Sequence, residues 1–184
     1  MKPTEDLMIE HNSIKSMLKI MSKISESIKA NNVFYTIDVE KIIDFLYVYI
    51  DQCHRVKEEK FFYPAFKSGN LPVDIDPEEL INEHNLGNVY LKEIICSVEN
   101  CKMGNIFSCE KIADCMINYV RFIQNHILKE ENTYFSLADK VLSEEKQNEL
   151  CEQFKTIDDE FFGHGVHKHF DEYFNDLKVK YQID

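Results

Sequence analysis

Residues 54–59 read His-Arg-Val-Lys-Glu-Glu, and residues 126–131 read His-Ile-Leu-Lys-Glu-Glu. The two segments share the spacing His-x-x-x-Glu-Glu and lie 72 positions apart. A second motif, Glu-His-Asn, precedes each of them, at residues 10–12 and at residues 83–85, with an offset of 73 positions. The chain therefore contains one pattern twice, and each copy offers two histidines and a pair of glutamates.

Apolar residues with helical spacing surround all four histidines of this pattern. They predict four long helices, and the low content of helix breakers, 5 Gly and 4 Pro, agrees with this. The expected helices cover about residues 4–30, 36–69, 77–103 and 108–140. Short links within each pair predict an all-α, antiparallel up-down four-helix bundle. We expect a single domain over residues 1–184, with the bundle at about 4–140 and a C-terminal helical extension at about 143–180.

Several residues mark the expected helix ends. Asp76 is a candidate cap before Pro77, a favoured first residue of a helix, and Gly104 is expected to stop the same helix. Pro64 is expected to kink or end the second helix. The C-terminal extension is expected to break at Gly163 and Gly165.

The position of each histidine relative to the links gives an independent indication of a shared site. His11 lies roughly 20 residues before the first link and His54 roughly 17 after it. His84 and His126 each lie roughly 19 residues from the second link. Because each helical residue rises about 1.5 Å, the two histidines of each helical pair should sit at nearly the same height.

Imidazole and carboxylate groups are ligands of non-haem metals, and a set without thiolate favours iron or manganese, and zinc less specifically. His-x-x-x-Glu places both side chains on one helix face. In the simplest assignment each helical pair gives two histidines to one metal, and one glutamate from each pair bridges both metals. The expected ligands are His11, His54, Glu58, His84, His126 and Glu130. A single histidine on an apolar face is more often a core residue, but four buried imidazoles and two buried carboxylates without a metal would cost several kcal/mol.

The pattern of these six residues resembles that of the hemerythrin family, in its HHE cation-binding branch. The resemblance covers residues 4–139. The block Phe62-Tyr63-Pro64-Ala65 is also similar to the family, as is the stretch at residues 163–167, Gly-His-Gly-Val-His. The resemblance implies a four-helix bundle that holds two non-haem iron ions (Fe²⁺/Fe³⁺) with an oxo or hydroxo bridge. It also implies binding of dioxygen, nitric oxide or peroxide.

The chain departs from the oxygen-carrying hemerythrins at Asn88. Those proteins have a fifth histidine one helical turn after the ligand that matches His84, and asparagine is a poor iron ligand. This difference favours sensing or binding of a small ligand over reversible oxygen carriage. The alternative is a di-iron enzyme in nitric oxide or peroxide detoxification or in iron–sulfur cluster repair. A third reading is an iron-responsive module that a protein partner recognises; the sequence does not identify such a partner.

Other polar residues near the pattern have less specific interpretations. We expect the glutamates that flank the ligands to be solvated, with an extra carboxylate ligand as the alternative; they are Glu10, Glu59, Glu83 and Glu131. Tyr47 and Tyr119, each seven residues before a ligand histidine, are expected to be core aromatics, or else hydrogen-bond donors to a bound ligand. Gly87 leaves room for close packing or a ligand. A surface cluster is expected from His164, His167 and His169, with a second metal site as the alternative.

Charge and composition exclude several classes of function. The formal net charge of −12 argues against nucleic-acid and anionic-membrane surfaces. No apolar run approaches a membrane span and no signal peptide is recognisable, so a cytoplasmic location is expected. The six cysteines are then expected to be reduced, and their spacing does not suggest a zinc site.

Overall fold

Every regular element in the described part of the chain is a helix. The computed structural model describes residues 1–31, 34–69, 72, 75–105, 107–162 and 166–183. Of residues 31, 107, 108, 162 and 166–171 it describes the backbone but not the side chain. The prediction of an all-α helical bundle is confirmed.

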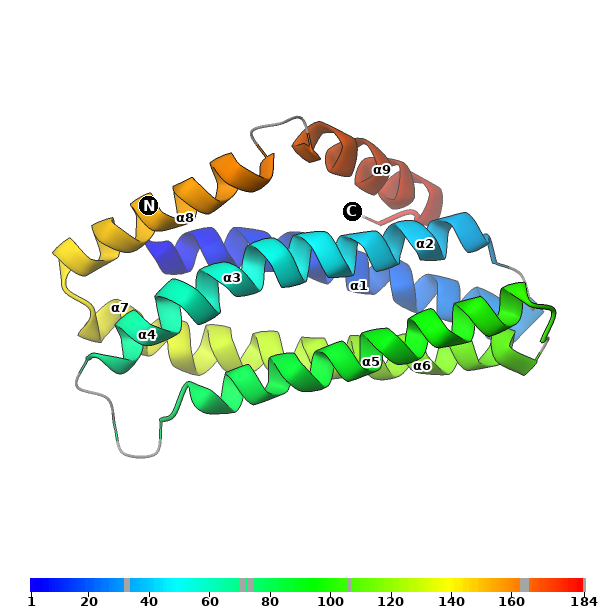
Figure 1. The fold of residues 1–184 in the computed structure, drawn as a ribbon, viewed down its shortest axis with the longest axis horizontal. Helices are drawn as coiled ribbons and strands as arrows, with labels where there is room; N and C mark the ends of the chain where they lie inside the picture. Colours follow the sequence, from blue (N-terminus) through cyan, green and yellow to red (C-terminus); the bar gives the residue numbers. More distant parts are fainter. Residues whose placement is uncertain (32–33, 70–71, 73–74, 106, 163–165, 184) are drawn as a thin grey trace.

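Four helical rods form the bundle (Figure 1). The first rod is α1 (Pro3–Asn31), and the third is α5 (Glu78–Lys102). The second rod is a continuous run of α2 (Thr36–Asp44), η1 (Phe45–His54), α3 (Arg55–Lys57), η2 (Glu58–Phe62) and α4 (Tyr63–Lys67). The fourth rod consists of α6 (Phe107–Lys129), η3 (Glu130–Phe135) and α7 (Ser136–Val141). The η segments are π-helical, with hydrogen bonds from residue i to i+5 and a wider turn than an α-helix.

The expected start and end signals act at several helix termini. Asp76 accepts a hydrogen bond from the backbone N–H of Glu78, the first residue of α5, at 3.1 Å, although the N-cap position itself is occupied by Pro77. Gly104 has a φ of +89°, a conformation that favours glycine, directly after the end of α5. Pro64 does not end the second rod, which continues to Lys67 after the π-helical turn of η2.

Two apolar clusters fill the bundle, one on each side of a polar layer. On α1, His11 lies between Leu7 of one cluster and Ile14 of the other. On the second rod the polar residues lie between Ile50 and Phe62, which belong to different clusters. The layer that contains the predicted ligands is therefore enclosed by hydrophobic core above and below.

Two further helices, α8 (Glu144–Phe162) and α9 (Val166–Tyr181), lie across α1 and the second rod (Figure 1). Leu150 and Phe154 of α8 join one apolar cluster, and Tyr173 and Leu177 of α9 join the other. The C-terminal extension therefore contributes to both parts of the core. The expected break at Gly163 and Gly165 lies outside the described residues.

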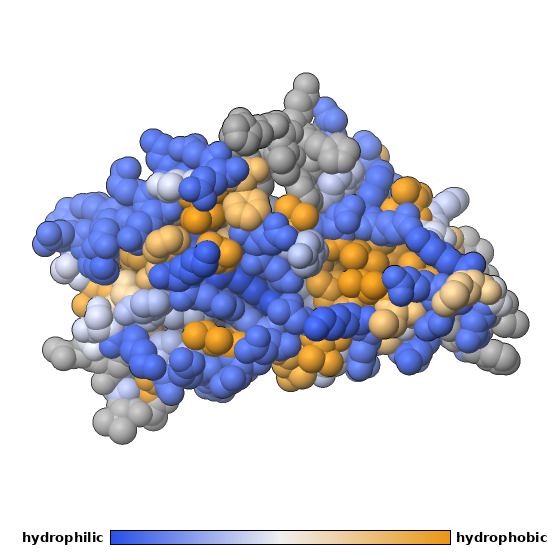
Figure 2. Space-filling model, in the orientation of Figure 1, coloured by the Kyte–Doolittle hydropathy of each residue, from blue (hydrophilic) through white to orange (hydrophobic). Residues whose placement is uncertain are grey.

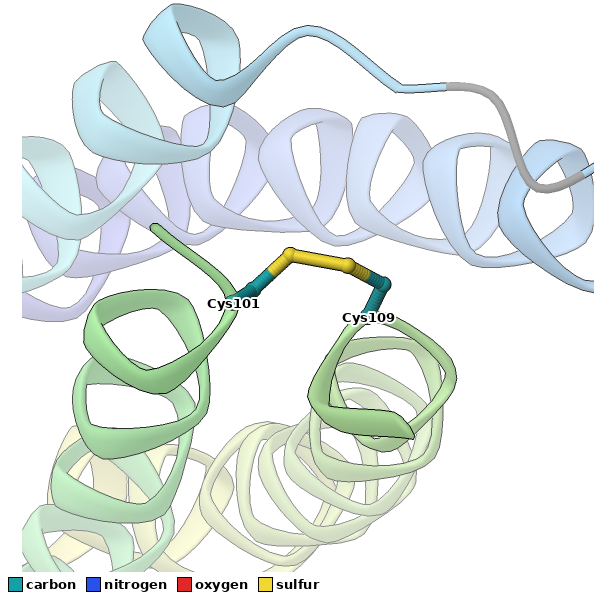
Figure 3. The surroundings of a disulfide bond; sticks show 2 residues. All are labelled: Cys101 and Cys109. Atoms are coloured by element: carbon teal, nitrogen blue, oxygen red, sulfur yellow. A yellow bond between two sulfur atoms is a disulfide. The ribbon is translucent and has the colours of Figure 1, made fainter. Parts of the chain in front are cut away.

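A disulfide joins Cys101, at the end of α5, to Cys109, near the start of α6 (Figure 3). The expectation that all six cysteines are reduced is therefore wrong for this pair. It rested on the expected compartment and did not consider that the turn after α5 brings these two residues together. The other four cysteines, Cys53, Cys96, Cys115 and Cys151, are free.

The surface combines hydrophilic and apolar areas. On the face in Figure 2, hydrophilic side chains cover much of the α8 end, and apolar side chains gather between α2 and α5. None of the helices searched in the described residues has both the length and the apolar composition needed to cross a membrane.

Candidate metal centre

The structure brings all six predicted site residues together inside the bundle. Each is buried, with 6% or less of its surface exposed. One comes from each of α1, α5, α6, η1, η2 and η3. Glu58 and Glu130 are the first residues of the π-helical segments η2 and η3, and π turns are frequent at functional sites. The six site residues are His11, His54, Glu58, His84, His126 and Glu130.

Glu130 spans the two halves of the site with its two oxygens. Its Oε2 lies 3.3 Å from Nε2 of His11, and its Oε1 lies 3.3 Å from Nε2 of His126. Two ligands at right angles on one metal, with bonds of about 2.1 Å, lie about 3 Å apart. The separations are therefore close to those expected when one carboxylate bridges two metals.

Glu58 repeats this arrangement from the opposite side of the bundle. Its Oε1 lies 3.4 Å from Nε2 of His54, and its Oε2 lies 3.4 Å from Nε2 of His84. His84 and His126 bring their Nε2 atoms within 3.0 Å of each other. Each carboxylate thus directs one oxygen to each pair of histidines, and the two pairs form the two halves of the site.

Several inward-facing atoms of the site lack hydrogen-bond partners among the described residues. They are Nε2 of His11, both carboxylate oxygens of Glu58, and Oε2 of Glu130. Burying such groups unpaired is unfavourable, and metal coordination would satisfy them. The potential ligand atoms form two groups of four that share the two glutamates, and all atoms in a group lie within 4.8 Å of one another. The residues present fit two metal ions with nitrogen and oxygen ligands.

The other ring nitrogen of each histidine, Nδ1, contacts a second glutamate. The pairs are Glu10 with His54 at 2.6 Å, Glu59 with His84 at 2.6 Å, Glu83 with His126 at 2.8 Å, and Glu131 with His11 at 3.0 Å. Each rod gives one glutamate to the histidine of the next rod, and the four contacts close a circuit around the bundle. We call these four glutamates the carboxylate ring. The expectation that most of them are solvated is wrong for Glu10, which is buried; the other three are partly exposed, but each of them also contacts a histidine.

These contacts fix the orientation of each imidazole. A carboxylate at Nδ1 favours a proton on that nitrogen and leaves Nε2 free to bind a metal. A hydrogen bond from His84 lowers the pKa of Glu59, and hydrogen bonds from His126 and His11 do the same for Glu83 and Glu131. The ring glutamates are therefore charged at neutral pH. The duplicated sequence contained this signal. In each copy one glutamate directly precedes the first histidine, and another directly follows the bridging glutamate.

The two bridging carboxylates titrate differently in the metal-free protein. Burial, followed by the negative charge of Glu130, raises the pKa of Glu58 well above its usual value. Burial also acts on Glu130, but His126 and His11 outweigh it and lower its pKa well below the usual value. In the same way, Glu130 and Glu83 overcome burial to raise the pKa of His126 to about 9. Without metal, the histidines beside Glu130 therefore favour its ionised form, whereas burial favours the protonated form of Glu58.

A third group of possible ligands, Glu10, Cys53 and Asp158, surrounds a buried lysine. Nζ of Lys57 lies 2.5 Å from Glu10 and 2.8 Å from Asp158, and only 1% of its side chain is exposed. An ammonium group at this position already balances the carboxylates. We therefore do not regard this group as a metal site.

Tyr63 is a site residue that the reading of the sequence missed. Its hydroxyl donates a hydrogen bond to Oε1 of Glu130 at 2.5 Å. The available signal was its position just after Glu58, in the block at residues 62–65. Tyr119 is buried in the core as expected, but Tyr47 is 54% exposed. The reason is that the wider turn of η1 changes which residues share the face of His54.

The remaining sequence expectations concern Asn88, Gly87 and the C-terminal histidines. Asn88 accepts a hydrogen bond from Nη1 of Arg55 at 2.8 Å. The guanidinium of Arg55 also fills the space beside Gly87, because a Cβ at position 87 would lie 2.6 Å from Nη2 of Arg55. His164 lies outside the described residues, as do the side chains of His167 and His169.

Comparison with known proteins gives one match. The family model described as hemerythrin HHE cation binding domain matches residues 2–138. No curated protein and no solved structure matches the chain significantly. The match covers the four-helix bundle except the last residues of α7, and every residue of the candidate centre, and the extension of α8 and α9 lies beyond it. The chain belongs to the hemerythrin HHE cation-binding family.

Proposed function

We propose that this protein holds two non-haem iron ions and uses them to bind or sense dioxygen, nitric oxide or peroxide. His11 and His54 would bind one ion, and His84 and His126 the other. Glu58 and Glu130 would bridge them, together with an oxo or hydroxo group. The observation that carries the proposal is the division of each carboxylate, with one oxygen toward each histidine pair.

Iron is favoured by the donor set and by the family. Imidazole nitrogens and carboxylate oxygens without thiolate suit iron, and the family is one of cation-binding domains. Asn88, which accepts a hydrogen bond from Arg55, occupies the position of the fifth histidine of the oxygen-carrying hemerythrins. We therefore favour small-ligand binding with accessible metal positions over reversible oxygen storage. Bound iron would supply redox chemistry, and the protein residues would set its ligands, charge and access.

Metal analysis of anaerobically purified protein tests this proposal. We expect about two irons per chain and an optical spectrum that changes on addition of dioxygen, nitric oxide or peroxide. His54→Ala and His126→Ala should each lose metal, while His167→Ala should keep both the metal and the spectrum. One zinc per chain, or no metal, would contradict the proposal.

The same experiment separates the binding function from the enzymatic alternative. A stable adduct that forms in proportion to the iron indicates a sensor or binding protein. Continuous consumption of nitric oxide or peroxide without a lasting adduct indicates an enzyme. We also propose a cytoplasmic location. The disulfide between Cys101 and Cys109 tests it, because structural disulfides are rare in reducing compartments.

A further inference from the structure

A small cavity lies beside the histidines of the candidate centre. It has a volume of about 10 Å³, close to the space that one water molecule needs. Isoleucine side chains, including Ile14 and Ile123, form its apolar walls, and His84 and His126 face it. Arg55 also lines this cavity and brings a permanently charged guanidinium to it.

Arg55 also lines a larger polar pocket on the outside of the bundle. This pocket has a volume of about 180 Å³, and its wall includes the exposed residues Lys60 and Asn85. Arg55 lines both spaces, so it lies between the outer pocket and the inner cavity that His84 and His126 face. A small ligand that moves from the outer pocket to the inner cavity along this side would pass the guanidinium.

Three neighbours hold the guanidinium in place. Nη1 contacts Oδ1 of Asp51 at 2.7 Å and Oδ1 of Asn88 at 2.8 Å. Nη2 lies over Gly87, at a distance of 2.6 Å from the position that a Cβ would take. Only 5% of Arg55 is exposed. Gly87 and Asn88 are thus the residues of α5 that contact the guanidinium of Arg55.

We propose that Arg55 selects small anions for the metal centre by donating hydrogen bonds to them as they enter the inner cavity. The inference rests on the two-metal function proposed above and adds a specificity-determining residue to it. Isoleucine walls offer no compensation for a negative charge, and a paired charge in such surroundings interacts strongly. The guanidinium has five N–H donors, and the contacts with Asp51 and Asn88 are both made by Nη1.

Azide is a suitable anionic probe, because it is longer than a one-water cavity and has to extend past Arg55. It is titrated into iron-loaded protein by absorption, and nitric oxide serves as a neutral probe. We expect Arg55→Met to weaken azide binding about tenfold or more, and to change nitric oxide binding less than about threefold. Arg55→Lys, which keeps the charge but loses the planar fork, should lie between the two.

Two further variants leave Arg55 in the chain. Gly87→Ala places a Cβ against Nη2, should displace the guanidinium, and should weaken azide binding. Asp51→Asn removes the carboxylate that neutralises the guanidinium, and should strengthen azide binding. If Arg55 only held the second rod against α5, the expected result would differ. Both variants would then lower the melting temperature and leave the azide affinity unchanged.

The outcomes distinguish this inference from the proposed function. If the wild-type protein holds no iron, the two-metal function fails. If every variant holds two irons and binds azide equally well, only the role of Arg55 fails. Equal loss of azide and nitric oxide binding in Arg55→Met would also overturn the inference, because the arginine would then shape the cavity without selecting charge.

Discussion

Asp158 lies 2.8 Å from the ammonium nitrogen of Lys57, and this contact connects the C-terminal extension to the candidate centre. Lys57 in turn lies 2.5 Å from Glu10, and Glu10 lies 2.6 Å from Nδ1 of His54. A continuous series of charged contacts therefore runs from α8, outside the family match, to a predicted metal ligand. The extension takes part in the organisation of the site.

Asp158→Asn should destabilise the protein by about 1–2 kcal/mol, because buried Lys57 loses one of its charged partners and keeps Glu10 and Asp6. For a chain of this size that corresponds to a fall in Tm of roughly 2–8 °C. Thermal unfolding of the metal-free protein measures it. Asp159→Asn is the matched control, since Asp159 is exposed on the same helix. Equal losses in the two variants would show that the contact with Lys57 does not stabilise the fold.

The carboxylate ring should tighten metal binding. Glu83→Gln removes the charge that orients His126, and loss of such a supporting carboxylate typically weakens metal binding by about 10–100-fold. Competition with a chelator of known affinity measures the change. Glu99→Gln, on the exposed face of α5, should leave the affinity unchanged. An unaltered affinity in Glu83→Gln would mean that packing alone orients the imidazole.

Tyr63→Phe should alter the electronic environment of the centre. The hydroxyl donates to Oε1 of Glu130, and its removal leaves that carboxylate more basic and free to shift. We expect the iron-loaded variant to keep two metals but to show shifted absorption bands. Tyr134→Phe is the control, because its hydroxyl bonds the backbone oxygen of Asp76, away from the ligands. Identical spectra for Tyr63→Phe and the wild type would show that this hydrogen bond does not tune the centre.

Much of the fold and of the candidate site could be predicted from periodicity and from the duplicated motif. On α6, for example, Tyr119 is buried, as expected for a core aromatic. On the second rod the same argument placed Tyr47 inside, and the structure exposes it. An α-helical period cannot anticipate π-helical turns, because these arise where packing around the site favours a wider turn.

Contacts between rods were harder to predict than positions along one rod. The arrangement of Arg55 over Gly87 depends on how closely the second rod approaches α5. The disulfide depends on the turn that brings Cys101 and Cys109 together. Sequence spacing gives the face of a helix, whereas the rotation and separation of neighbouring helices follow from the packing of the whole core.

The disulfide should be present in protein isolated under oxidising conditions, and should stabilise the end of the bundle. Thiol counting after denaturation without reductant should give four free thiols among six cysteines. The double variant Cys101→Ser/Cys109→Ser should lose about 2–3 kcal/mol, as expected for closing a loop of this short length. Cys96→Ser, an exposed and unpaired position, is the control. Six free thiols in protein purified without reductant would contradict the pairing and would favour a reducing compartment.

Two histidines act on opposite sides of pH 6.5 in the metal-free protein, and their combined contribution to stability is greatest near that value. Burial lowers the pKa of His84 to about 4, so the unfolded chain takes up a proton before the folded protein does as the pH falls below 6.5. His126, with its pKa raised to about 9, stabilises the fold while protonated, and this contribution is lost as the pH rises from 6.5 through 9.

Each pKa unit of difference corresponds to about 1.4 kcal/mol, so the contribution of the two histidines to Tm should fall by several degrees on either side of pH 6.5. Below pH 4.5 the loss should steepen, since the lowered pKa values of Glu59, Glu83 and Glu131 add stability that disappears on protonation. Unfolding scans of chelator-treated protein from pH 4 to about 9.5 test this. His126→Gln should flatten only the alkaline side; if that side is unchanged, His126 does not carry the proton that the geometry assigns to it.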